Sequence, residues 1–294
     1  MSATDFSPVT LDAMQDYLAL FARTPRRASD YSFTNLWGWA EHYGLEWRFE
    51  HGLCWLRQTL PEVRYWAPVG PWGDIDWASC TCLGKGMEFI RVPEELASLW
   101  REVLGDRVTV QETPGQWDYL YDSADLADLK GNRFHRKKNH VNGYAKAYGI
   151  DYHPLTPDCI EAVIEMQEEW CQWRECAESE SLLAENEAVI RVLEEWDSIP
   201  GLVGGALYAE GRMVAYTVGE ALDDETLVVH FEKGRGDYRG VYQAINQQFV
   251  QYEGARFRLV NREQDLDDEG LRKAKQSYYP VDYLRKATVR IAPV

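Results

Sequence analysis

The sequence has no long apolar run and no surplus of positive charge. None of its apolar stretches reaches the roughly 18–20 residues that a helix needs to cross a bilayer, so we expect no transmembrane segment. Lys and Arg number 31 against 48 Asp and Glu, and the net charge of −17 argues against indiscriminate binding to nucleic acid. Residues 1–6 lack the basic and apolar regions of a secretory signal, which favours a cytoplasmic location.

Sequence motifs of several enzyme classes are also missing. There is no Gly-x-Ser-x-Gly nucleophile motif, no Walker loop and no repeated His/Cys pattern. The close pair Cys80 and Cys82 has no second pair that would complete a zinc site. We therefore expect no metal and no covalent enzyme intermediate. The lack of a secretory signal favours reduced thiols, and we expect them to be mostly buried. The cysteines concerned are Cys54, Cys80, Cys82, Cys159, Cys171 and Cys176.

Apolar and aromatic residues are plentiful. The 294 residues are enough for one large domain or two of ordinary size, and 45% of them are hydrophobic. Twelve tryptophans can fill a core, and they can also form flat walls of binding sites.

Charge is distributed unevenly along the chain. Between Asp128 and Asp151 there is no acidic residue, whereas residues 158–197 hold thirteen acids against two arginines. The basic stretch is either a surface for an anionic partner such as tRNA or a helix face that pairs with the acidic segment. The candidate nucleic-acid-binding residues are Lys130, Arg133, Arg136, Lys137 and Lys138.

The second half of the chain has the clearer pattern of elements. Thr156 before Pro157 is typical of a helix start, and Glu210-Gly211 is typical of a hairpin turn. We predict a strand, two helices, three antiparallel strands, a glycine-rich turn, a helix, a strand, a helix and a last strand. These elements cover 150–154, 156–173, 181–196, 202–209, 213–220, 226–232, 233–240, 241–252, 256–260, 270–277 and 283–291.

The first half has a looser version of the same order. It predicts helices at 10–22, 35–43 and 84–103, strands at 53–57, 62–66, 107–111 and 117–121, and a basic helix at 123–147. This order resembles that of the GNAT acyltransferases. The predicted fold is α+β, with two tandem GNAT-like domains, each a mixed, mostly antiparallel sheet flanked by helices. Residues 1–147 form the first domain, which ends in the basic helix, and residues 148–294 form the second, which carries the candidate active site.

The C-terminal run Gly270-Leu-Arg-Lys-Ala-Lys275, followed by Tyr278-Tyr-Pro280, resembles the signature of the C-terminal domain of phosphatidylglycerol lysyltransferases and, still better, of soluble relatives of that domain. The resemblance covers almost the whole chain. Its other stretches are Asp30-Tyr-Ser-Phe-Thr-Asn-Leu-Trp37, Phe134-His-Arg-Lys-Lys-Asn-His140, His230-Phe-Glu-Lys233, Tyr238-Arg-Gly-Val-Tyr-Gln-Ala-Ile-Asn246 and Asn261-Arg-Glu-Gln-Asp265.

The resemblance implies an acyl or aminoacyl donor, which in the lysyltransferases is aminoacyl-tRNA, with a lipid as acceptor. The leading hypothesis is an acyl- or aminoacyl-transferase in which an acceptor amine or hydroxyl attacks the donor ester directly. The acceptor class stays open between a small molecule, a peptide and a lipid headgroup, and so does the oligomeric state. No cofactor is required beyond the donor, aminoacyl-tRNA or acyl-CoA.

Two other functions compete with this hypothesis. One is a CoA-dependent GNAT N-acyltransferase, although the turn Arg235–Gly240 departs from the spacing of the phosphate-binding motif of those enzymes. The other is a non-catalytic GNAT-like module that binds a ligand or a protein.

Acyl transfer needs a proton acceptor, hydrogen-bond donors for the tetrahedral oxyanion and cations for the donor's phosphates. Glu232, Glu263 and Asp265 are expected near the gap between two neighbouring strands, where any of them could orient or deprotonate the acceptor. Tyr278 could donate a hydrogen bond to the oxyanion or the leaving group. The alternatives are helix caps for residues 263 and 265 and core packing for Tyr278.

Substrate-binding candidates lie on the same elements. Arg272 and Lys275 are three residues apart, so they share a helix face that could grip phosphate, unless they pair with acids of the chain. Trp170 and Trp173 could wall a pocket for a cationic acceptor. His230 is either a structural histidine or a base. The remaining candidates are Arg239, Gln243, Asn246 and Asn261.

Overall fold

The computed structural model describes residues 6–83 and 86–293, and the chain forms two compact units. Unit 1 contains the chain up to Asp118, residues 264–272 and the chain from Tyr283 onward; unit 2 contains residues 119–263 and 273–282. This division differs from the predicted boundary at residue 147, because residues 119–147 lie in unit 2 and the last strand returns to unit 1.

Unit 1 is built on a seven-stranded sheet with the order β1-β2-β3-β4-β5-β14-β6. Only β4 and β5 pair in parallel; the other neighbours are antiparallel. The strands are β1 (Ser7–Pro8), β2 (Glu46–Glu50), β3 (Leu53–Gln58), β4 (Arg64–Trp66), β5 (Met87–Pro93), β6 (Val108–Glu112) and β14 (Lys286–Ile291). The helices are α1 (Met14–Phe21), α2 (Phe33–Gly38), α3 (Ala40–Tyr43) and α4 (Glu94–Leu104).

The prediction of one or two helices over residues 84–103 is wrong for the first part of this range. β5 occupies Met87–Pro93, and α4 begins only at Glu94. Residues 89–92 are rich in apolar and β-branched side chains, which pack well on a pleated surface. Glu94 and Glu95 then favour a helix start, because carboxylates stabilise the positive end of the helix dipole.

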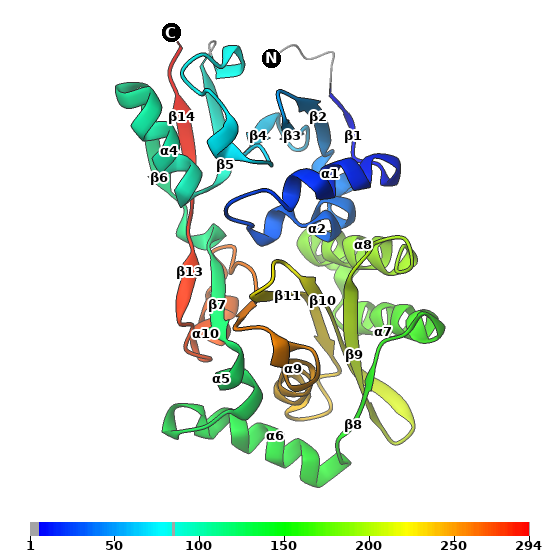
Figure 1. Cartoon of the computed structure of the whole chain (residues 1–294). Helices are drawn as coiled ribbons and strands as arrows, with labels where there is room; N and C mark the ends of the chain where they lie inside the picture. Colours follow the sequence, from blue (N-terminus) through cyan, green and yellow to red (C-terminus); the bar gives the residue numbers. More distant parts are fainter. Residues whose placement is uncertain (1–5, 84–85, 294) are drawn as a thin grey trace. The chain divides into compact units, whose positions relative to one another are not determined.

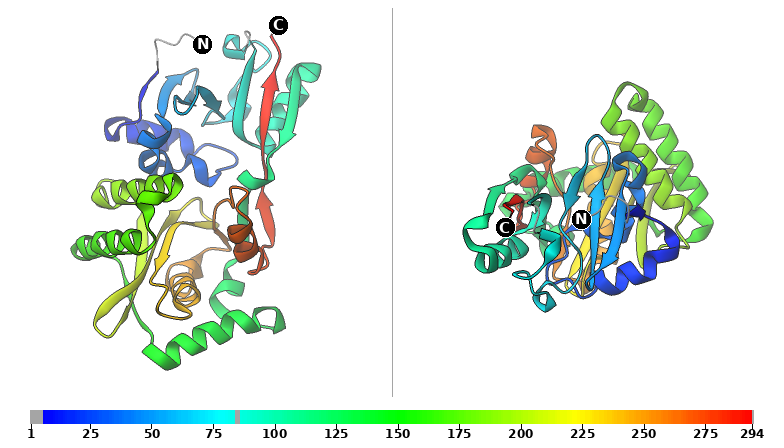
Figure 2. Two further views of the ribbon diagram at one scale, coloured as in Figure 1. Left: turned by 180° about the vertical axis from the view of Figure 1, so that it is seen from behind. Right: turned by 90° about the horizontal axis from the view of Figure 1, so that it is seen from above.

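Unit 2 holds a second seven-stranded sheet with the order β13-β7-β12-β11-β10-β9-β8. Its strands are β7 (Asp118–Asp122), β8 (Asp151–Pro154), β9 (Leu202–Ala209), β10 (Arg212–Ala221), β11 (Thr226–Gly234), β12 (Leu259–Asn261) and β13 (Asp282–Leu284). The helices are α5 (Ser123–Asp128), α6 (His135–Tyr148), α7 (Ile160–Trp173), α8 (Glu180–Glu194) and α9 (Val241–Tyr252). Helix α10 (Glu269–Gln276) begins in the part 264–272 of unit 1 and continues into unit 2. Figures 1 and 2 show α7 and α8 on one face of this sheet and α9 on the other.

The predicted fold class is confirmed. Both sheets are mixed and mostly antiparallel, helices flank each of them, and the element order from β8 to β12 is the predicted one. In β10 the residues from Met213 to Gly219 are all buried. Because both faces of this strand are covered, its sequence is mostly apolar and does not alternate with polar residues. A tandem GNAT-like arrangement fits both units. Within the described ranges, no helix has the length and apolar character required to traverse a membrane.

The predicted helix over 123–147 is wrong as a single helix. Asp122 caps α5 by accepting a hydrogen bond from the Asp125 backbone, and α5 ends at Asp128, before Leu129, which adopts left-handed backbone angles. Gly131 follows with φ of 88°, a conformation that favours glycine, and α6 starts at His135. The basic residues are therefore split between a turn and α6.

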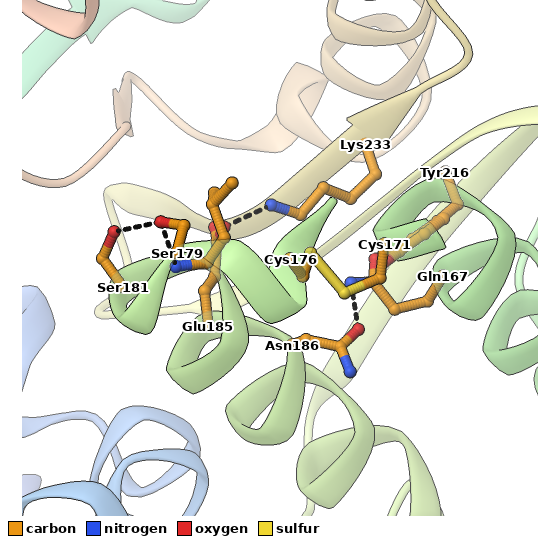
Figure 3. Close-up of a disulfide and its surroundings, with 10 residues drawn as sticks. Gln167, Cys171, Cys176, Ser179, Ser181, Glu185, Asn186, Tyr216 and Lys233 are labelled. Carbon is orange, nitrogen blue, oxygen red and sulfur yellow. Dashed lines mark hydrogen bonds and ion pairs between the residues drawn. A yellow bond between two sulfur atoms is a disulfide. The ribbon is translucent and has the colours of Figure 1, made fainter. Parts of the chain in front are cut away.

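The expectation of reduced thiols is wrong for two cysteines. Cys171 near the end of α7 forms a disulfide with Cys176, and their Cα atoms are 5.2 Å apart (Figure 3). Cys54 is free and buried, as expected, whereas Cys80 and Cys159 are free and partly exposed. The side chain of Cys82 lies outside the described part of the chain.

Candidate active site

A gap opens in the sheet of unit 2 where β11 and β12 part. These parallel strands pair only through Thr226–Val228 and Leu259–Asn261, and β11 then continues to Gly234. In the part of β11 beyond this pairing lie His230 and Glu232. His230 is the extra residue of a β-bulge, because the adjacent residues Val218 and Gly219 of β10 pair with Phe231 and Val229. Arg262 and Glu263 follow β12 directly. Two pairs of charged side chains therefore meet across the gap, as the sequence predicted for Glu232 and Glu263.

The first pair belongs to a group that we call the Glu232 cluster, made of Glu232, Asn246, Arg262, Tyr278 and Lys137. Arg262 Nη2 donates to Glu232 Oε1 at 3.1 Å, and Asn246 Nδ2 on α9 donates to Glu232 Oε2 at 3.2 Å. The Arg262 guanidinium carbon lies 5.0 Å from the centre of the Tyr278 ring. Burial raises the pKa of Tyr278 to about 12, against the opposing charge of Arg262, so its phenol is protonated at neutral pH and can donate.

Lys137 approaches the same tyrosine from α6. Its Nζ lies 4.0 Å from the centre of the Tyr278 ring. Burial lowers the pKa of Lys137, and the charges of Arg262 and Arg136 lower it further, to about 8. Roughly a tenth of this side chain is therefore an uncharged amine at pH 7, and about half of it at pH 8.

The second pair across the gap forms the His230 cluster, made of Glu220, His230 and Glu263. His230 Nε2 lies 2.9 Å from Glu220 Oε1, and His230 Nδ1 lies 2.8 Å from Glu263 Oε1. Burial alone would lower the pKa of His230, but hydrogen bonds and charge from both carboxylates raise it to about 9. His230 is thus an imidazolium that donates hydrogen bonds to two acids. This makes it a structural histidine, one of the two roles that the sequence left open, rather than a base.

Asp265 and Arg272 lie in the segment 264–272 of unit 1 and bind each other. Arg272 donates to both oxygens of the buried Asp265, at 2.9 and 3.0 Å, and also to Asp267 at 2.6 Å. In unit 2, Lys275 donates to the backbone carbonyl of Arg262. Arg272 is therefore held by acids of the chain, which is the alternative that the sequence left open, whereas Lys275 binds a backbone carbonyl.

The other predicted substrate-binding residues on this side differ in exposure. Asn261 is buried at the end of β12, and its Oδ1 accepts a hydrogen bond from the Glu263 backbone at 2.8 Å. Gln243 is half-buried on α9, and Arg239 is exposed. Gly240 begins α9 with φ of 92°, and a Cβ there would come within 2.4 Å of the His140 carbonyl oxygen, so the approach of α6 to α9 requires glycine.

Trp170 already has a cation on its ring. Lys233 Nζ lies 4.2 Å from the Trp170 ring centre and 2.7 Å from Glu185 Oε2. The place predicted for a cationic acceptor is therefore taken by an internal lysine. Figure 3 shows the side chain of Lys233 directed at Glu185. Trp173 is 58% exposed and packs against Gly236, where a Cβ would come within 2.4 Å of its ring.

The basic stretch is only partly paired. Lys130 binds Asp128 at 2.6 Å, and Arg133 binds Asp125, so these two cations use acids of α5 rather than of residues 158–197. Arg136 and Lys138 are exposed on α6. This leaves positive charge on the surface of unit 2, as a nucleic-acid contact would require.

Sequence reasoning missed two members of these clusters. Arg262 lies inside the quoted stretch Asn261–Asp265, but nothing in its spacing distinguishes it from a surface cation. Glu220 lies one residue before the end of β10 and 10 residues before His230, and the antiparallel pairing of β10 with β11 brings the two side chains together. A strand-pairing prediction could have found Glu220.

A surface hollow of about 390 Å³ lies in unit 1, beside β5, β6 and β14, and is lined among others by Met87, Thr109 and Ile291. It contains none of the predicted site residues. We place the candidate active site at the Glu232 cluster instead, because charged and neutral donors converge there in the interior of unit 2.

Most of the chain matches known proteins. The family model described as the C-terminal part of phosphatidylglycerol lysyltransferase matches residues 21–289. A conserved protein of unknown function from Bacteroides thetaiotaomicron has a similar structure, with a TM-score of 0.87 and 30% identity over 97% of this chain and 99% of that one.

More distant proteins are also similar to this chain, one in structure and one in sequence. L-PGS from Bacillus licheniformis has a TM-score of 0.65 and 11% identity, over 99% of this chain and 94% of that one. An uncharacterized protein of Mycoplasmoides gallisepticum is 21% identical over 176 residues, 59% of this chain but only 56% of that protein's length. The match of the family model over most of the sequence shows that this chain belongs to the phosphatidylglycerol lysyltransferase C-terminal family.

Proposed function

We propose that this protein transfers an aminoacyl group from aminoacyl-tRNA to an acceptor amine or hydroxyl. The observation that carries the proposal is the Glu232 cluster, in a chain that belongs to a family named for lysyl transfer. Arg262 and the protonated phenol of Tyr278 offer a positive charge and a hydrogen bond within one site. Attack on an ester creates negative charge on its carbonyl oxygen, and such donors stabilise that charge.

The roles within the cluster follow from the contacts. Glu232 and Asn246 hold the guanidinium of Arg262 in one orientation, so Glu232 acts through Arg262. Arg262 faces the developing oxyanion, and Tyr278 donates to it or to the departing ribose oxygen of the tRNA. Exposed cations of the basic stretch, Arg136 and Lys138 among them, contact the tRNA backbone.

The test is transfer of radiolabel from lysyl-tRNA, and from a mixture of charged tRNAs, to vesicles of phosphatidylglycerol or to free amines. Arg262→Ala should lower the transfer rate about 100-fold or more, because a donor to the oxyanion is lost. Arg258→Ala is the matched control: Arg258 is an exposed arginine of the same segment, paired with Glu225, and its loss should leave the rate unchanged.

Two further measurements decide whether the acyl donor is aminoacyl-tRNA or acyl-CoA. Affinity for tRNA should fall by orders of magnitude between about 50 and 200 mM salt if several phosphates are contacted. A thermal shift with acetyl-CoA, together with no transfer from any charged tRNA, would reject the proposal in favour of a CoA-dependent enzyme.

A further inference from the structure

We propose that Lys137 takes the proton from the attacking acceptor group, a role that rests on the transfer reaction proposed above. The sequence had placed Lys137 among the tRNA-binding cations. Its contacts in unit 2 place it at the candidate active site instead.

The three predicted acidic bases are all engaged. Glu232 accepts hydrogen bonds from Arg262 and Asn246, and Glu263 accepts one from His230. Asp265 accepts two from Arg272. A carboxylate that already binds a cation loses that interaction when it takes a proton, so these acids serve better as ion-pair partners than as proton acceptors.

Lys137 differs from them in its surroundings. Its Nζ lies over the face of Tyr278, and Arg262 lies against the same ring. Among residues 6–83 and 86–293, no carboxylate lies within ion-pair distance of Lys137. The charged groups that face it are cations, Arg136 from its own helix and Arg262 from beyond β12, while Glu232 is bound to Arg262.

These neighbours favour an uncharged amine. Burial and the two guanidinium groups lower the pKa of Lys137 to about 8, whereas an isolated lysine stays charged until about pH 10.4. A base is most effective when its pKa lies near the working pH. The Tyr278 ring fixes the position of the amine, since a lysine side chain otherwise has many rotamers.

The proposed step conserves protons and electrons. The lone pair of Lys137 Nζ takes the proton from the acceptor's N–H or O–H, and the acceptor atom forms a bond to the ester carbonyl carbon. The carbonyl electrons move to oxygen, beside Arg262. The intermediate then collapses, the bond from carbon to the ribose oxygen breaks, and the Lys137 ammonium returns the proton to that oxygen.

The decisive variant is Lys137→Arg, which keeps the positive charge but cannot release a proton near neutral pH. In the wild-type protein kcat/KM should rise with pH through about 8, following the pKa of Lys137. Lys137→Arg should lower kcat/KM roughly 100-fold or more, without that rise, and should keep the affinity for tRNA. Lys273→Arg, at an exposed lysine of α10 outside the basic stretch, is the control and should behave as the wild type.

A measurement without substrate accompanies the kinetics. Carbon-13 NMR of the reductively methylated protein should show one lysine, absent from Lys137→Arg, that titrates near pH 8. If Lys137 instead titrates near the ordinary lysine value of about 10.4, its role as the proton acceptor is overturned. If Lys137→Arg transfers as fast as the wild type with the same pH profile, Lys137 only binds anions and this role alone fails. If the wild-type protein transfers nothing from any charged tRNA, the proposed function fails and this role with it.

Discussion

At the scale of single residues, the chemistry of the gap between β11 and β12 depends on which charged side chains pair there. Arg262 binds Glu232, and His230 binds Glu220 and Glu263. A buried charge is tolerated only when paired and hydrogen-bonded. Arg262 and His230 satisfy this condition with carboxylates of the same unit. Lys137 stands apart, since only cations and an aromatic face surround it.

The His230 cluster makes stability depend on pH. The pKa of His230 is raised in the folded state to about 9, so its stabilisation is fully present below about pH 6.5 and is lost as pH rises through 9. We expect the loss to approach about 3 kcal/mol at most, the equivalent of the pKa shift. Urea unfolding at pH 6 and pH 9.5 checks this.

The matched variants are His230→Gln and His153→Gln. His153 is an exposed histidine paired with Asp151, so its replacement should leave the difference between the two pH values intact. His230→Gln should be less stable at pH 6 and should lose most of that difference. An equal pH dependence in His230→Gln and the wild type would mean that other groups cause it.

At the scale of elements, the end of α7 is held by several links to its neighbours (Figure 3). The disulfide joins Cys171 to Cys176, and Gln167 joins α7 to Tyr216 of β10 at 2.6 Å and to Asn186 of α8 at 2.8 Å. Helix α7 therefore keeps contact with both α8 and the sheet even where its last turn is exposed.

Removal of the disulfide should cost a small but measurable part of the stability. The bond closes a loop with a sequence separation of five residues, for which chain entropy predicts about 2 kcal/mol. Cys171→Ala/Cys176→Ala should lower Tm by that equivalent. Reductant should lower the Tm of the wild type but not that of the double variant. Alkylation of all six cysteines in the freshly purified, unreduced protein would show that the bond is absent.

The elements also show where sequence patterns suffice. From β8 to β12 the order was predicted correctly, because periodicity and turn residues are local signals. The predicted helix at 84–103 included β5, and the helix at 123–147 split into α5 and α6. In these places the outcome depends on strand partners and on one glycine conformation, which a local window does not contain.

At the scale of the whole molecule, unit 1 is assembled from three separate parts of the chain, and a buried network joins them. Lys286 Nζ of β14 lies 2.7 Å from Asp118 Oδ1 and also binds Asp30. Gln264 donates to both acids, at 2.8 and 3.1 Å, and Arg91 binds Asp30 at 2.9 Å. Buried and half-buried ion pairs and hydrogen bonds thus connect residues 30, 118, 264 and 286.

Breaking this network should be costly. Lys286→Met leaves Asp30 and Asp118 buried with one cation fewer, and removal of one partner from a buried ion pair typically costs about 3–5 kcal/mol. Chemical unfolding measures the loss. Arg290→Ala, in the same strand, removes an exposed ion pair with Glu88 and should cost at most about 1 kcal/mol. Equal losses for the two variants would contradict a dominant role for the network.

The sequence by itself determined the α+β class, the order of elements in unit 2, the family and the expectation that Glu232 and Glu263 face one gap, because these depend on periodicity, turns and recognisable motifs. Only the tertiary structure decided which charges pair. In the structure Arg272 binds Asp265, and Arg262 binds Glu232. The amine of Lys137 lies over the ring of Tyr278, and β14 belongs to the sheet of unit 1. Ion-pair partners depend on distances between segments that lie far apart in the chain, and no local pattern encodes those distances.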